Sequence, residues 1–141
     1  MCGIIAVLRR KSRRTPPSVE ALRALLAEAE LALADGRDRQ HLAAAAASLV
    51  LLDRELRGVA GLWTLLQAPD VAKELAQRTT ALQAAVTAFE RSLDADTVGA
   101  DPDPALEQRN QALVQLKDAL WAVLRDRLPH AEAVRDLAGG D

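Results

Sequence analysis

The chain carries its only thiol at the second position, on Cys2. Cotranslational trimming generally removes Met1 when the next residue is small, and Cys is small. Cys2 would then bear a thiol, with a pKa of about 8.5, beside a free α-amino group, with a pKa of about 7.7–8.0. An N-terminal nucleophile whose own amine acts as the base is a known way of activating a side chain. Because Gly3 adds no side chain beside the sulfur, an acyl carbon has room to approach, and we expect Cys2 to be a nucleophile.

Residues 3–8, Gly-Ile-Ile-Ala-Val-Leu, form the element that must position this thiol. A short apolar run that is rich in β-branched residues and is followed by charges and Pro is typical of a buried β-strand. No second run of this kind occurs later in the chain. Since unpaired backbone N–H and C=O groups are costly when buried, this strand needs partners outside these residues. We therefore expect the chain to be the start of a longer protein or one piece of an assembly.

The opening Met-Cys-Gly-Ile-Ile-Ala-Val-Leu, residues 1–8, resembles the start of the class II glutamine amidotransferases. The resemblance implies that Cys2 is catalytic: its thiol attacks the side-chain amide of glutamine, ammonia leaves for a second domain, and water releases glutamate from the thioester. It also implies that residues 4–8 are the first strand of the Ntn-hydrolase α/β sandwich of that family. The implied partners are glutamine, as substrate, and the remainder of the amidotransferase, in the same chain or in a separate subunit.

Within this family, the chain is most similar to the glutamine–fructose-6-phosphate aminotransferase-like proteins of high-GC bacteria. These proteins have SIS domains, and they carry a helical insertion soon after the first strand. The resemblance implies that residues 1–17 belong to the glutaminase core, that residues 18–138 form the inserted bundle, and that residues 139–141 are a tail. It also implies a sugar phosphate as the acceptor of the ammonia.

The sequence lacks the other motifs of that family. The Arg-Gly-x-Asp-Ser segment that helps to hold glutamine is absent, and Arg-Gly-Val-Ala-Gly at residues 57–61 matches only its first two residues. The Asn-Gly pair of the oxyanion hole is also absent, because Asn110 is followed by Gln111. The loss of one oxyanion donor typically costs about 10²–10³ in rate. We therefore expect these 141 residues alone to be inactive.

The composition predicts a mainly α-helical protein. Of the 141 residues, 24 are Leu and 29 are Ala, which are strong helix formers, and Tyr is absent. A single Cys excludes a scaffold of intramolecular disulfides. No apolar run approaches the ~18–20 residues that span a membrane, and the first residues do not resemble a signal peptide. We expect a cytoplasmic protein that does not enter the membrane.

Apolar residues recur at helical spacing from Ser18 onward and predict an antiparallel bundle of about four helices. We expect Pro129 to end the last of these helices, with a short turn of helix after it. Three of the helices are expected to begin at a capping residue, namely Ser18, Asp38 and Asp103. The remaining helix, third in the chain, is expected to begin near Asp70. The fold class is therefore mainly α, with one short N-terminal β-strand ahead of the bundle.

Other residues with functional potential have simpler interpretations. Neither His41 nor His130 has partners at the spacing of a zinc site, so the sequence indicates no metal and no cofactor. Trp63 and Trp121 are expected to anchor the core, whereas exposed Trp side chains would indicate a docking surface.

Five basic residues lie within residues 9–14 and could contact phosphates, but a solvated turn is the simpler interpretation. Two alternatives to the enzyme remain. One is a non-catalytic helical interaction module, and the other is a nucleic-acid-binding arm, which the net charge of −2 disfavours.

Overall fold

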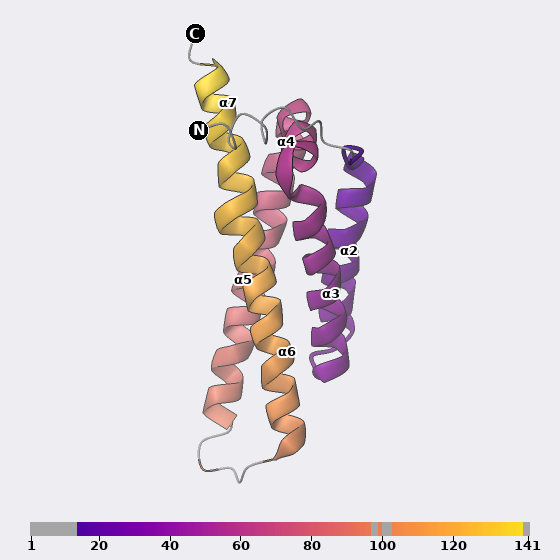
Figure 1. Ribbon diagram of the computed structural model, residues 1–141. Coiled ribbons are helices and arrows are strands. Elements are labelled where there is room, and N and C mark those ends of the chain that lie inside the picture. The colour runs from indigo at the N-terminus through magenta and orange to yellow at the C-terminus, as the bar shows by residue number, and fades with distance from the viewer. Residues whose placement is uncertain (1–13, 97–98, 100–102, 140–141) are drawn as a thin grey trace, which may run out of the picture.

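The computed structural model of the protein describes residues 14–96, 99 and 103–139, and these are almost entirely helical (Figure 1). They form five helical rods, because the last three helical segments follow one another without a break. The segments are α2 (Val19–Asp35), α3 (Arg39–Leu56), α4 (Gly58–Gln67), α5 (Pro69–Asp96), α6 (Pro104–Trp121), the π-helical η1 (Ala122–Arg127) and α7 (Leu128–Gly139). The described residues include no strand, and the strand predicted over residues 3–8 lies outside them.

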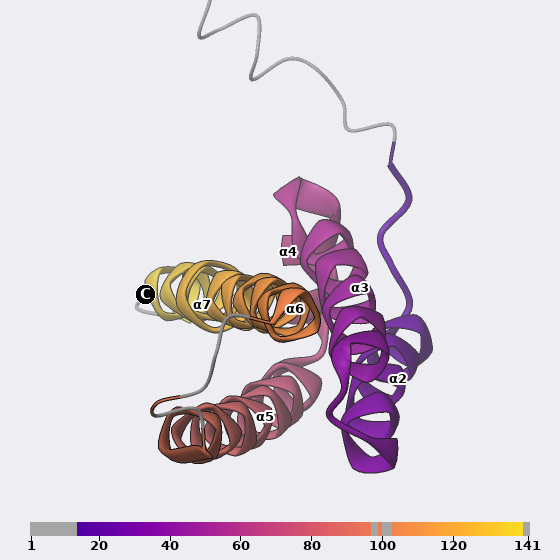
Figure 2. The ribbon, with the colours of Figure 1, turned by 90° about the horizontal axis from the view of Figure 1, so that it is seen from below.

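Four long passes of the described chain build a helical bundle in which successive passes alternate in direction (Figure 1). In Figure 1, α2 and α5 run away from the end that carries α4, whereas α3 and the α6–η1–α7 rod run toward it. The contacts of α3 are most extensive with α2 and α6, and α3 lies between these two helices in Figure 2. Because the number of passes is even, α2 begins and α7 ends at the same end of the bundle (Figure 1).

The caps at three predicted helix starts are confirmed. The side chains of Ser18, Asp38 and Asp103 accept hydrogen bonds from backbone N–H groups two or three residues ahead, at 3.1, 3.0 and 3.0 Å. Such bonds satisfy N–H groups that have no partner within the first turn of a helix. Pro104, which has no N–H to satisfy, follows the last of these caps at the first helical position.

Asp38 provides a pH-dependent contribution to the start of α3. The backbone N–H of His41, and then its ring, hydrogen-bond to the carboxylate and lower the pKa of Asp38 below the ordinary value of 3.8. A carboxyl group whose pKa is lower in the folded state stabilises that state above its unfolded pKa. This contribution is lost as the pH falls through the folded pKa.

We expect an NMR titration of the Asp38 carboxyl carbon to have its midpoint below 3.8. His41→Ala removes the ring and keeps the backbone donor, so the midpoint should stay below 3.8 in that variant. A midpoint at or above 3.8 in the parent protein would show that the cap does not hold this carboxylate in solution.

The apolar stripes predicted from the sequence meet in one core. Along α5 the fully or nearly buried apolar residues skip from Leu75 to Leu82, and Thr79 fills this gap. Thr79 is fully buried, and its hydroxyl donates a hydrogen bond of 2.6 Å to the carbonyl oxygen of Leu75. Thr79 can occupy a buried position between apolar residues because its hydroxyl has a hydrogen-bond partner within its own helix. The largest fully buried apolar side chains are those of Leu22, Leu26, Leu42, Leu49, Leu52, Leu65, Leu75, Leu116, Leu120 and Val123.

The prediction of about four helices needs a correction, because α4 is a separate short helix. Two glycines make the corner between α3 and α4. Gly58 has a φ of +70°, which L side chains rarely adopt. A Cβ on Gly61 would lie 2.3 Å from the backbone carbon and oxygen of Leu56. The Arg-Gly-Val-Ala-Gly sequence at residues 57–61 therefore has a structural function as this corner.

The prediction that Pro129 ends the last helix is wrong, because α7 (Leu128–Gly139) contains this residue in its first turn. The backbone N–H of Leu128 donates to the carbonyl oxygen of Val123, which is the wider hydrogen-bonding pattern of a π-helix. A proline is tolerated in a first turn and where the hydrogen-bond ladder is already interrupted. η1 supplies this interruption, so the rod continues through the proline.

Candidate functional site

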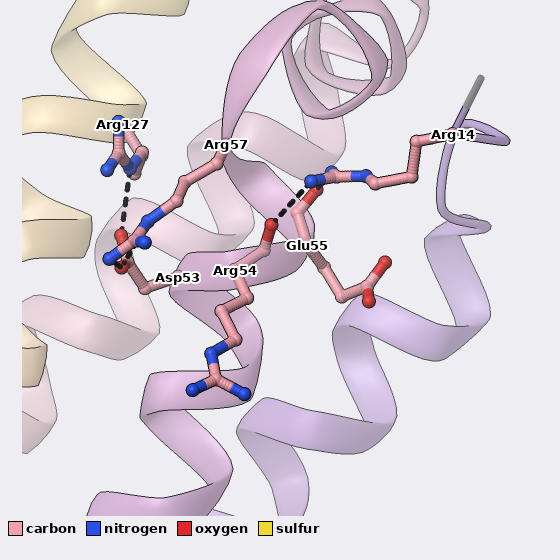
Figure 3. A network of polar contacts seen from close by, with 6 residues as sticks. All are labelled: Arg14, Asp53, Arg54, Glu55, Arg57 and Arg127. Carbon is pink, nitrogen blue, oxygen red and sulfur yellow. Dashed lines mark hydrogen bonds and ion pairs between the residues drawn. The ribbon is translucent and has the colours of Figure 1, made fainter. Parts of the chain in front are cut away.

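Cys2, the predicted catalytic residue, lies outside the described residues, which begin at Arg14. The structure describes how the chain between Arg14 and α2 is attached to the bundle (Figure 3). The guanidinium of Arg14 donates hydrogen bonds to the carbonyl oxygens of Arg54, at 2.9 Å, and of Glu55. The hydroxyl of Thr64 in α4 donates to the carbonyl oxygen of Pro17 at 2.8 Å. These bonds fix residues 14–17 to the corner between α3 and α4.

The attachment of Arg14 follows from the physics of a helix end. The last carbonyl groups of a helix have no partner within the helix. They also carry the negative end of the helix dipole, which favours a cation. Arg54 and Glu55 are in the last turn of α3. The carbonyl oxygen of Arg54 also accepts from the backbone N–H of Arg57 at 3.2 Å, so the guanidinium of Arg14 supplies a second donor there and interacts favourably with the dipole.

An ion-pair cluster around the buried Asp53 lies on the other side of the same helix end (Figure 3). The side chain of Asp53 is only 6% exposed. One carboxylate oxygen accepts from Nε and Nη2 of Arg57, at 3.0 and 2.7 Å. The other accepts from Nε of Arg127, in η1, at 2.8 Å. Two guanidiniums therefore hold one buried carboxylate, and Arg127 joins α3 to η1.

The charges of this region are predominantly positive. Figure 3 shows four arginines, Arg14, Arg54, Arg57 and Arg127, with two acids. The acids are Asp53 and Glu55, and the formal charge of these six residues is +2. Arginine stays charged at any pH at which proteins are studied. The described cluster can therefore bind and orient groups, but its guanidiniums cannot exchange protons with a substrate.

Two hollows flank this cluster. We define the α3–α6 groove as the larger one, with a volume of about 650 Å³. It is lined by Ala43, Ala46, Ala47, Val50, Leu51, Asp53, Arg54, Arg57, Gln115, Asp118, Ala119 and Ala122. The second hollow, of about 260 Å³, is lined by Leu56, Gly58, Val59, Leu62, Asp126, Arg127 and His130. The lining is apolar apart from Asp53, Arg54 and Arg57, toward the α4 end of α3, and Gln115 and Asp118 of α6.

The two histidines do not join this cluster in a common site. His41 contacts Asp38 through Nδ1 at 2.8 Å, in the first turn of α3. His130 is exposed in α7 and lines the second hollow. Among residues 14–96, 99 and 103–139, no group of three or more His, Cys, Asp or Glu side chains could hold a metal ion.

The prediction that Trp63 and Trp121 anchor the core is wrong. Their exposed fractions are 55% and 54%. Residues two apart on a helix do not share a face. Trp63 lies two positions from both Gly61 and Leu65, which are buried. Ala60, three positions before Trp63, is also buried, so the spacing of apolar residues alone gave no clear signal that Trp63 is exposed.

The Asp53 cluster is the part of the site that sequence reasoning missed. Asp53 lies on the apolar side of α3, with Leu49, Leu52 and Leu56 among the buried residues of the same helix. Arg57, at the i+4 position, could have been identified from the sequence as an ion-pair partner of Asp53. Arg127 lies 74 residues away, so no local pattern could connect it to Asp53.

None of the helices in the described part of the chain is long and apolar enough to cross a membrane. Comparisons of the chain with protein families, with curated proteins and with solved structures found no match.

Proposed function

We propose that this chain is the N-terminal part of a glutamine-dependent amidotransferase of the glutamine–fructose-6-phosphate aminotransferase type, acting in the cytoplasm. The observation that carries the proposal is the Met-Cys-Gly-Ile-Ile opening, which puts the only thiol beside the amine that Met1 removal would free. The amine takes the proton of the thiol, and the sulfur attacks the side-chain carbonyl carbon of glutamine. The ammonium group so formed gives this proton to the amide nitrogen, the C–N bond breaks and ammonia leaves. Water then hydrolyses the thioester and releases glutamate.

The topology of the bundle supports its interpretation as an inserted domain. The described core cluster contains residues from Leu22 to Ala131, so the bundle has a core of its own. Its first and last helices begin and end at the same end of the bundle (Figure 1). A unit with a core of its own can fold as a domain within a longer chain. The attachment of residues 14–17 at the α3–α4 corner fixes where the bundle meets the segment that carries Cys2.

The proposal assigns the other functions of the active site to the remainder of the amidotransferase. Oxyanion donors and glutamine-binding side chains come from that part, since their motifs are missing from this sequence. The ammonia acceptor, a sugar phosphate, belongs to a further domain. The partners are therefore glutamine and the rest of the enzyme, and no metal or cofactor takes part in the proposed glutaminase step.

The role of the terminal amine is tested by a lysine inserted between Met1 and Cys2 in the complete enzyme. A bulky second residue keeps Met1 in place, so the thiol remains but no longer has its own amine. We expect the release of glutamate from glutamine to fall by about 10²–10⁴-fold, which is the usual contribution of a general base. Intact mass would verify that Met1 is retained.

The matched control is a lysine inserted between Lys11 and Ser12, which lengthens the chain equally and leaves the terminus unchanged. This variant should release glutamate at close to the parent rate. Undiminished activity in the protein that retains Met1 would contradict the proposed role of the amine.

A second candidate function is a non-catalytic helical interaction module. The exposure of Trp63 and Trp121 favours it, because Trp is enriched at the centres of protein interfaces. The two candidate functions predict different sequences in the reading frame beyond Asp141. An Arg-Gly-x-Asp-Ser segment followed by an Asn-Gly pair would support the enzyme, and the absence of both from that frame and from neighbouring genes would support the interaction module.

A further inference from the structure

We propose that the α3–α6 groove is the docking site for the apolar residues 3–8 of the same chain. Docking depends only on the groove and on this segment, so it can hold or fail independently of the glutaminase activity. In the complete enzyme, where the proposed function requires the same residues as a strand, the groove would cover them until their strand partners are available.

The chemistry of the groove fits this occupant. Its lining includes the small side chains of Ala43, Ala46, Ala47, Ala119 and Ala122. Small side chains leave space for bulky β-branched ones such as those of Ile4, Ile5 and Val7. Two large apolar side chains at its edge, Val50 and Leu51, are 39% and 46% exposed in the described structure. Burying these surfaces against an apolar segment is favourable, because it removes them from water.

The dimensions of the groove also fit. Along α3 the groove runs from Ala43 to Arg57, which at the helical rise is about 21 Å. A segment of six residues in extended conformation spans about 20 Å. Residues 3–8 therefore have the length of the groove.

The attachment of Arg14 brings this segment close to the groove. Arg14 donates to the carbonyl oxygen of Arg54, and the side chain of Arg54 lines the groove. Arg14 reaches the end of α3 from the side of α2, whereas Asp53 and Arg57 face η1 (Figure 3). The segment must therefore cross the end of one helix, about 10–12 Å wide.

The five residues 9–13 can span this distance, because an extended chain covers roughly 3.3–3.6 Å per residue. Such a short tether keeps the effective concentration of the segment on the order of millimolar.

The experiment uses Cys2, the only thiol of the chain, to carry a nitroxide spin label on the ¹⁵N-labelled protein. We expect paramagnetic broadening to be concentrated on the amides of residues 43–54 and 119–122. The peak intensities there should fall several-fold relative to the reduced label. Broadening that is absent, or that is spread evenly over the bundle, would overturn the proposal.

Two variants make the test specific. Ala47→Glu places a charge at an exposed position in the groove and should restore the intensities. Its matched control, Ala84→Glu, changes an exposed Ala of α5 and should leave the broadening in place. Ile5→Asp alters the docking segment, leaves every described residue unchanged, and should also restore the intensities. Persistent broadening in Ala47→Glu and Ile5→Asp would contradict the proposal.

The other possible occupant is a second copy of the chain. Mixing ¹⁵N-labelled protein without a spin label with spin-labelled protein without ¹⁵N distinguishes the two cases. We expect no broadening in this mixture. Broadening of the groove amides in the mixture would show that the segment of a second copy fills the groove and would overturn docking within one chain.

Discussion

Cys2→Ala is expected to abolish the release of glutamate from glutamine by the complete enzyme. The substitution removes the proposed nucleophile, and the loss of a nucleophile lowers kcat by on the order of 10⁴–10⁶-fold. The bundle should remain intact, because Cys2 lies before the described helices. Glutamate released per unit time at saturating glutamine is the measurement, and circular dichroism verifies the helical content.

The control for Cys2→Ala changes two residues close to it in the sequence. Arg9→Ala with Arg10→Ala removes two charges from the basic segment and leaves the thiol and the amine unchanged. Its glutaminase rate should stay close to that of the parent enzyme. Substantial glutamate release without Cys2 would contradict the assignment of the nucleophile.

Removal of both arginines that contact Asp53 is expected to destabilise the bundle by about 3–5 kcal/mol, the cost of leaving a buried carboxylate without a partner. Arg57→Met with Arg127→Met retains much of the apolar part of both side chains and removes their charges. The carboxylate of Asp53, which is only 6% exposed, then has neither of the guanidinium partners that the structure shows. Urea denaturation followed by circular dichroism measures the change in the free energy of unfolding.

The control for this experiment adds Asp53→Leu to the two arginine substitutions. Replacing a whole buried ion pair with apolar residues of similar size is often neutral or stabilising. We therefore expect the triple variant to recover most of the lost stability. A triple variant as unstable as the double variant would show that the arginines stabilise the bundle by packing rather than by charge.

The helix starts and the apolar stripes could be predicted because they depend on nearby residues. Ser18, Asp38 and Asp103 each cap a backbone N–H group two or three residues ahead, so the signal and the structure lie within one turn. Most leucines of α2 and α3 recur at helical spacing and are buried, namely Leu22, Leu26, Leu33, Leu42, Leu49, Leu52 and Leu56. Local patterns of this kind predict the mainly α-helical bundle.

The features that the sequence did not predict depend on unusual hydrogen bonding within a helix or on contacts between distant parts of the chain. Thr79 is buried because its hydroxyl bonds within its own helix and its position faces the core. The rod continues through Pro129 because η1 changes the hydrogen bonding just before it. In the candidate site, Cys2 was identified from a motif at the N-terminus. The pair of Asp53 and Arg127 could be identified only from the folded arrangement of α3 and η1.

The π-helical turn η1 also determines how α7, which follows it, is rotated about the axis of the rod. A turn closed by i→i+5 bonds holds one residue more than a turn of α-helix. Since each residue of an α-helix advances by about 100°, this additional residue turns α7 by about that angle relative to an uninterrupted rod. Leu128 and Ala131 are buried in this rotated register, and α7 packs against α4. Deletion of a single residue within η1 would restore the α-helical ladder and rotate this face of α7 away from α4.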